Sequence, residues 1–302
     1  MNRFCVILCA LGMILPAAAR PASPNIVTFA DGRKLAVEVH RVEGEKLVCS
    51  RALEFGRAVE RYPLDSIVSV TFPEQVPLAA AASLAPAADR IEKLRPLWNS
   101  LRPFVRVPGT PAGHAGLLLA RALYEEGPPA ALAEAMEILQ TLERDDPSPE
   151  TRAGALSLRL IVMGAQGRGP EAREEAARIF EQTGRPEPRV RAAAGYALAN
   201  LLREDLAELE RENPRWELDP LVRPDRNRLH HRIIELFLQP YLENGSQAGP
   251  AARSLWALVE FHRVNDREKE AASVARDIVE IYPETPEAPQ AEAFLQTLKT
   301  KP

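Results

Sequence analysis

The stretch from residue 252 to residue 283, ARSLWALVEFHRVNDREKEAASVARDIVEIYP, decides the fold that we predict. In its second half Val274, Ile278 and Ile281 recur at intervals of four and three residues, which is the period of an amphipathic helix. Pro283 follows directly, and proline cannot continue a helix. Short amphipathic helices joined by tight corners predict stacked antiparallel helix pairs.

Part of this stretch recurs earlier in the chain with the same spacing. The three copies are Ala135-x3-Leu139-x7-Pro147, Ala176-x3-Phe180-x7-Pro188 and Ala271-x3-Ala275-x7-Pro283. Three matches indicate an internal repeat. They resemble the second helix and closing proline of the tetratricopeptide repeat (TPR), in which a small residue lets paired helices approach. The resemblance implies a TPR-like α-solenoid of helical hairpins over residues 89–302, with an insertion around 213–228. A generic helical bundle is the alternative, because Val259 and Ile278 depart from the family pattern.

Residues 24–74 have a different period. Apolar residues alternate with other residues, for example at Leu35, Val37 and Val39, which predicts short antiparallel strands. Closing four or five strands into a small barrel would remove exposed edges. Two motifs resemble the SH3-like or Sm-like barrels of bacterial envelope proteins: Phe29-x-Asp31-Gly32-Arg33 and Ile67-x2-Val70-x-Phe72.

The segment from 75 to 88 is rich in alanine and proline and carries no alternation, which is typical of a linker. The predicted fold class is therefore mostly α: a TPR-like solenoid preceded by a small antiparallel β-barrel-like domain.

Residues 1–19 have the features of a secretory signal peptide. Phe4 to Leu15 is an apolar run, and Ala17 and Ala19 stand at the small-residue positions of a cleavage site. We expect cleavage after Ala19 and export to a bacterial periplasm or beyond. The alternative is a retained membrane anchor, but the span from Phe4 to Ala19 is short of the roughly 20 residues that cross a bilayer. No later apolar run is long enough to span.

Composition and motifs favour an interaction protein over an enzyme. The chain has 302 residues, 46% of them hydrophobic and 26% charged, with a net charge of −4, which fits a globular protein and disfavours nucleic-acid binding. No spacing of histidine and cysteine predicts a metal site, and no motif predicts a cofactor or a nucleophile. Cys49 on a predicted strand is interpreted as a buried structural residue. The enzyme alternative is an envelope hydrolase or transferase with a scattered active site.

One helical face of the last repeat copy is the predicted partner surface. Arg253, Trp256, Glu260 and Arg263 are spaced by three, four and three residues and so share a face. The TPR resemblance implies that these positions line a concave groove, while Leu255, Leu258 and His262 pack inside the hairpin. For Trp256 the alternative is a role in the core, because it adjoins Leu255 and Val259.

A second candidate surface is a cluster of arginines around the single acid Asp225, with His230 and His231 alongside. Such a cluster could bind an anionic polymer or the acidic tail of a partner, whereas the alternative is a solvated loop and first helical turn. Its members are Arg223, Arg226, Arg228 and Arg232.

These patterns together predict an exported, non-enzymatic scaffold of the bacterial cell envelope. It would bind a peptide or protein partner on the concave face of the solenoid. The alternative to this role, besides an enzyme, is a cell-wall glycan-binding module that uses the barrel. The identity of the partner and the oligomeric state stay open.

Overall fold

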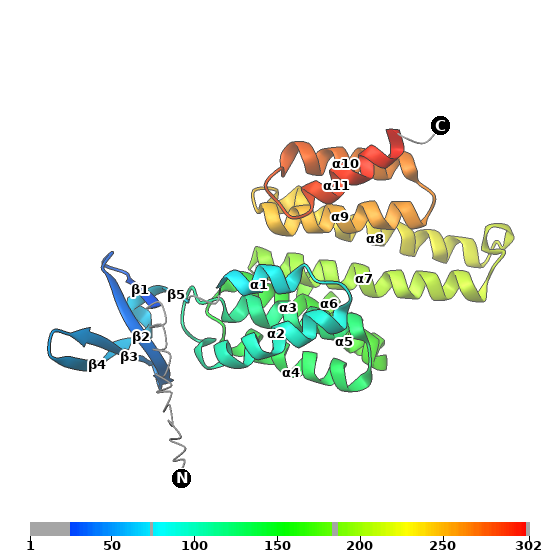
Figure 1. Cartoon of the computed structure of the whole chain (residues 1–302). Coiled ribbons are helices and arrows are strands. Elements are labelled where there is room, and N and C mark those ends of the chain that lie inside the picture. The colour runs from blue at the N-terminus through cyan, green and yellow to red at the C-terminus, as the bar shows by residue number, and fades with distance from the viewer. Residues whose placement is uncertain (1–24, 73–74, 183–186, 300–302) are drawn as a thin grey trace, which may run out of the picture.

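The computed structural model describes residues 25–72, 75–182 and 187–299; the predicted signal peptide lies outside them. The chain is mostly helical, with a small antiparallel sheet at its N-terminal end, as predicted (Figure 1). The sheet lies beside the first helices, and the chain ends on the last helix at the opposite end of the helical part. Within the described residues, no helix combines the length and apolar character needed to cross a bilayer.

Five strands form the sheet, and all neighbouring pairs are antiparallel. The order is β4-β3-β2-β1-β5. The alternating apolar residues explain the pairing, since Val27, Val37 and Val70 are buried on one face. The strands are β1 (Asn25–Phe29), β2 (Lys34–Glu43), β3 (Lys46–Leu53), β4 (Gly56–Pro63) and β5 (Ile67–Thr71).

The expected closure into a barrel is wrong, because β4 and β5 stand at the two edges of an open sheet. Side chains of the helical part cover the core instead. The ring of Phe104 lies 5.3 Å from that of Phe72, and Val105 and Val107 are buried in the same hydrophobic cluster as the strands. Gly109 approaches β5 so closely that a Cβ there would lie 2.6 Å from Cβ of Ser69. A sheet covered in this way buries its apolar face without closing.

The segment expected as a linker contains helix α1 (Gln75–Ala82). Leu78 and Ala81 are buried, and they belong to one cluster that also contains Val27 of β1 and Leu94 of the next helix. Only residues 83–86 connect α1 to the next helix. The sheet and the first helices therefore share a continuous core, which local composition does not indicate.

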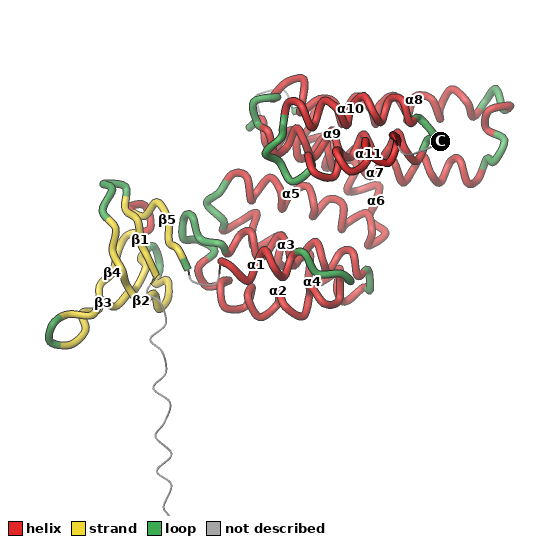
Figure 2. Tube along the Cα trace, turned by 45° about the horizontal axis from the view of Figure 1, so that its top comes forward, coloured by secondary structure: helices red, strands yellow, loops and turns green. Residues whose placement is uncertain are grey.

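Most helices after α1 pack mainly against their neighbours in the chain, so that the helical part is an array (Figures 1 and 2). Helix α7 contacts both α5 and α6, and α7 and α8 are longer than the helices around them. The helices are α2 (Ala87–Leu101), α3 (Ala112–Glu126), α4 (Pro129–Asp145), α5 (Pro149–Met163), α6 (Gly169–Glu181), α7 (Pro188–Glu212), α8 (Val222–Asn244), α9 (Ala248–Val264), α10 (Glu268–Ile281) and α11 (Ala288–Lys299).

The recurring alanines lie where the helices pack. Ala135 on α4, Ala176 on α6, and Ala271 and Ala275 on α10 are all fully buried. A small side chain at these points lets neighbouring helices approach closely. The three copies of the motif thus fall on even-numbered helices, α4, α6 and α10.

Candidate binding groove

An open groove runs across the odd-numbered helices of the array. Its volume is about 830 Å³, and its lining residues come from α3, α5, α7 and α9 and from the start of α11. Each of these helices contributes side chains to the lining, for example Tyr124, Ser157, Tyr196, Trp256 and Gln290 in chain order. Segments more than 160 residues apart in the chain therefore contribute to one surface.

The groove forms on this side because the even-numbered helices pack behind the odd-numbered ones. At Gly195 of α7, an added Cβ would lie 2.9 Å from Cε2 of Phe180 on α6, so the Phe180 ring packs directly on the backbone of α7. Between two groove-lining helices, a Cβ added to Gly154 of α5 would lie 3.3 Å from Cδ1 of Leu117 on α3. Close approach on the packed side leaves the longer side chains of the odd-numbered helices to line the other side.

The predicted partner surface is part of this groove. Arg253, Trp256 and Glu260 line it, and Arg263 lines an adjoining depression together with Glu260. The residues expected to pack inside the hairpin, Leu255, Leu258 and His262, are buried. The side chain of Trp256 is half-buried against the C-terminal hydrophobic cluster and also lines the groove, so its role in binding stays a prediction.

The sequence did not single out the residues that α3, α5 and α7 contribute. Tyr124, Tyr196, Ser157 and Asn200 carry no local motif. The alanine motif was recognised on α4, α6 and α10. Stepping back one helix from each copy points to α3 and α5, and so to Tyr124 and Ser157, but no copy lies on α8 to point to Tyr196 and Asn200 of α7.

The groove combines aromatic rings with charges of both signs. Tyr124, Tyr196 and Trp256 supply the rings. Glu125 and Glu210 are held by Arg90 and Arg226. Among the described residues, Arg121, Arg253 and Glu260 of the lining form no ion pair, and Arg253 and Glu260 are exposed. These side chains are available to a charged ligand.

The second candidate surface, the arginine cluster, is not one surface. Arg226 is buried: its Nε donates to Oε1 of Glu210 at 2.7 Å, and its guanidinium lies 4.3 Å from the ring of Trp216. Arg228 pairs with Asp225 on its own helix. Arg232 pairs with Glu181 and Glu235, and only Arg223 is exposed without an ion pair among the described residues. The predicted anion site is therefore divided among separate structural contacts.

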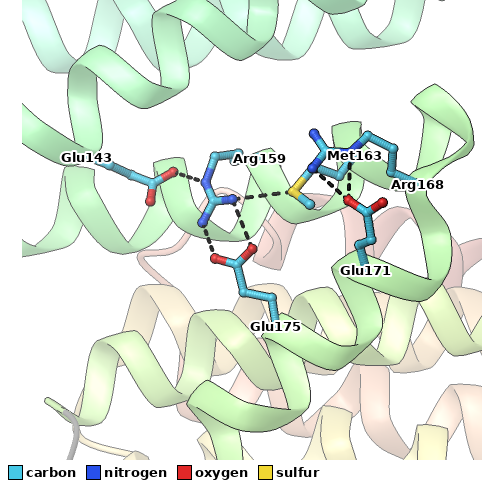
Figure 3. A network of polar contacts seen from close by, with 6 residues as sticks. All are labelled: Glu143, Arg159, Met163, Arg168, Glu171 and Glu175. Carbon is cyan, nitrogen blue, oxygen red and sulfur yellow. Dashed lines mark hydrogen bonds and ion pairs between the residues drawn. The ribbon is translucent and has the colours of Figure 1, made fainter.

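A half-buried ion-pair network joins α4, α5 and α6 outside the lining of the groove. The Arg159 guanidinium donates to Glu143 at 2.5 Å and to Glu175 at 2.7 Å, and Figure 3 shows it between the two carboxylates. Burial raises the pKa of Glu143 despite its bond to Arg159, whereas the hydrogen bond from Arg159 lowers the pKa of Glu175. With both carboxylates bound to one guanidinium, the network holds three helices together.

Histidine and cysteine chemistry lies away from the groove. In the described part of the chain no group of three or more histidine, cysteine, aspartate or glutamate side chains could hold a metal ion. His230 and His262 are buried and do not line the groove. Cys49 is fully buried, as predicted; burial, with Glu60 adding to it, raises its pKa to about 11.

Comparison of the chain with protein-family models, with curated proteins and with solved structures gave no match. The groove and the helices that line it are therefore the features from which a function can be inferred. Arg253, Trp256 and Glu260, which the sequence placed on one face of a helix, lie on a surface to which four other helices contribute. These helices are α3, α5, α7 and α11.

Proposed function

We propose that this chain is a non-enzymatic interaction protein that binds an extended peptide segment of a protein partner in the groove. In this proposal the helical part is a TPR-like solenoid, and the groove is its concave face. The observation that carries it is the alternation of the helices: α3, α5, α7 and α9 contribute to the lining, while the alanine motifs lie on α4, α6 and α10.

Stacked hairpins produce such an alternation for a physical reason. If each hairpin places its first helix inside and its second helix outside, every second helix of the array faces one continuous concave surface. Helix α11 then completes the inner layer at the C-terminal end, where Gln290 lines the groove. A bundle built around one central core would bury its inner helices instead.

The chemistry of the groove suits a peptide. Aromatic side chains such as Tyr196 and Trp256 provide apolar contact area for side chains, and they are frequent at binding hot spots. Arg253 and Glu260 lie about two helical turns apart on α9 and carry opposite charges. A ligand with separated charges of both signs would therefore be oriented along the helix.

The proposal includes export. The apolar run and the small residues before Arg20 support cleavage of residues 1–19 and a location in the periplasm or outside the cell. An intact-mass measurement on protein recovered from the envelope should give a chain that starts at Arg20. A mass that includes Met1 or a lipid would contradict it.

The peptide proposal is tested by selecting ligands from a random phage-displayed peptide library with residues 20–302, and then measuring the affinity of the selected peptides. Arg253→Glu and Glu260→Lys should each weaken binding about tenfold or more, because each reverses a charge at the groove. The matched control is Arg276→Glu, which makes the same change at an exposed position on the outer helix α10. Equal losses in the control and the groove variants would contradict the proposal.

One observation favours the glycan-binding alternative as a second candidate function. Phe55 at the turn between β3 and β4 is 91% exposed, whereas Phe29 and Phe72 are buried. An exposed aromatic ring can stack on a sugar. Sedimentation with purified cell-wall glycan, compared between the protein and its Phe55→Ala variant, separates this function from peptide binding.

A further inference from the structure

Two buried imidazoles lie where the α7–α8 hairpin meets the α9–α10 pair. His230 on α8 is 2% exposed and His262 on α9 is 6% exposed. The ring of Phe261 contacts both, with its centroid 5.0 Å from that of His230 and 6.3 Å from that of His262. We call Arg226, His230, Phe261 and His262 the α8–α9 junction.

Neither imidazole has an acceptor for a second proton among the described residues. Nε2 of His230 and Nδ1 of His262 are buried and have no hydrogen-bond partner among the described residues. A neutral imidazole tolerates one unpaired nitrogen, but an imidazolium carries a proton on both nitrogens. Protonation would therefore create a charged donor that is buried without an acceptor, which is strongly unfavourable.

The charges around the junction also oppose protonation. His230 faces Arg226 and His231 on its own helix, His262 on α9, and Arg267 after α9. Burial, followed by these cations, lowers the pKa of His230 to about 4. Burial also lowers the pKa of His262, with Arg267 adding to the effect.

The nearby acidic side chains do little to stabilise the protonated form of His230. Glu270 on α10 acts on His262 in the opposite direction to burial. Glu210 on α7 is already bonded to Arg226.

The same junction holds the wall of the groove. Arg226 donates to Glu210 at 2.7 Å and to Asn265 at 3.1 Å, and these two residues line the groove on α7 and after α9. Phe261, which contacts both imidazoles, also lines it. Separation of α8 from α9 would thus move apart the two sides of the groove.

We propose that the α8–α9 junction is an acid-sensitive element that opens the C-terminal part of the groove when His230 and His262 are protonated. The consequence for ligand binding rests on the proposed function, whereas the opening itself does not. The closed form is fully favoured above the ordinary histidine pKa and loses stability as the pH falls from about 6.5 towards 4. From these two values, His230 alone increases the open fraction about 20-fold between pH 7 and pH 5.

Hydrogen exchange of residues 20–302 without ligand tests the opening. At pH 5, after correction for intrinsic exchange rates, residues 226–232 and 257–267 should lose about 20-fold or more of their protection relative to pH 7, while α3 to α5 change little. The variant His230→Phe/His262→Phe should abolish this loss, because phenylalanine fills the sites without titrating. His231→Gln, which removes one of the smaller contributions to the lowered pKa of His230, should leave most of the loss in place.

Two outcomes would overturn the proposal: an equal loss of protection in the double variant, or a loss spread evenly over the helices. If the double variant does not fold, an NMR titration of the imidazole resonances in the unaltered protein replaces it. A titration midpoint of His230 above pH 6 would also overturn the proposal. A selected peptide should bind more weakly at pH 5 than at pH 7 in the unaltered protein only. Failure of every peptide to bind at pH 7 would contradict the proposed function. The hydrogen-exchange experiment would still test whether the junction opens, because it is done without ligand.

Discussion

Gly116 of α3 lies directly against the indole of Trp98 on α2, where an added Cβ would be 2.8 Å from Cζ3 of the ring. Cδ1 of the buried Leu142 on α4 would be 3.1 Å from the same atom. Both neighbours are rigid parts of the core, so neither side chain can move away cheaply. The contact fixes how closely the first helices of the array approach.

Gly116→Ala should therefore destabilise the protein by about 1–3 kcal/mol, because overpacking a filled core displaces side chains and backbone. Chemical denaturation measures the effect. Gly249→Ala is the control: this residue lies in the first turn of α9, and the new Cβ would lie 3.9 Å from Oε1 of Glu150, an ordinary van der Waals distance. A variant at Gly116 that is as stable as the control would show that the helices are not in close contact.

Trp256 has two roles that different substitutions can separate. Trp256→Ala removes half-buried packing as well as the ring, so it should lower both stability, by about 2 kcal/mol, and peptide affinity. Trp256→Leu keeps an apolar side chain and should stay within about 1 kcal/mol of the original stability while binding collapses. If affinity falls only in proportion to stability across the two variants, Trp256 belongs to the core alone.

Arg159→Leu should destabilise the protein by about 2–4 kcal/mol, since it leaves Glu143 and Glu175 half-buried without their shared cation. Thermal or chemical denaturation at neutral pH gives the value. Replacing both carboxylates as well, in Arg159→Leu/Glu143→Leu/Glu175→Leu, should recover most of the loss. No recovery would mean that the destabilisation comes from lost packing of the arginine side chain.

Cys49 should be inert in the folded protein. Its pKa of about 11 leaves almost no thiolate at pH 8, and the side chain is fully buried. In residues 20–302 it is the only cysteine, so an aromatic disulfide reagent reports on it alone. Labelling should take place at the rate of unfolding and become fast in guanidinium chloride. Rapid labelling without denaturant would contradict the buried position.

Several elements could be predicted because their signals are local. A polar cap followed by proline is a local signal of a helix start, and at the beginning of α5 Oγ of Ser148 accepts a hydrogen bond from the backbone N–H of Thr151 at 3.2 Å. On α9, the helical period placed Arg253, Trp256 and Glu260 on one face, and the family resemblance implied that Leu255 and Leu258 are the buried residues.

Other features were missed because they depend on neighbours far along the chain. Arg226 belongs to a cluster of arginines in the sequence, yet Glu210 and Asn265 bury it. The alanines around Leu78 indicate a linker by composition, yet a sheet and a helix on either side provide enough apolar surface to fold them into α1.

The sequence by itself determined the order of a strand-forming segment and a helical array, the positions of the close-packed alanines and the face of α9 that carries Arg253 and Trp256. These follow from periods of two and 3.6 residues, which local geometry imposes on any chain. Only the tertiary structure decided that the sheet stays open, that Arg226 and His230 are buried, and that Tyr124 and Gln290 share a groove. Burial and shared surfaces depend on which distant residues come into contact, and the spacing along one helix does not contain that information.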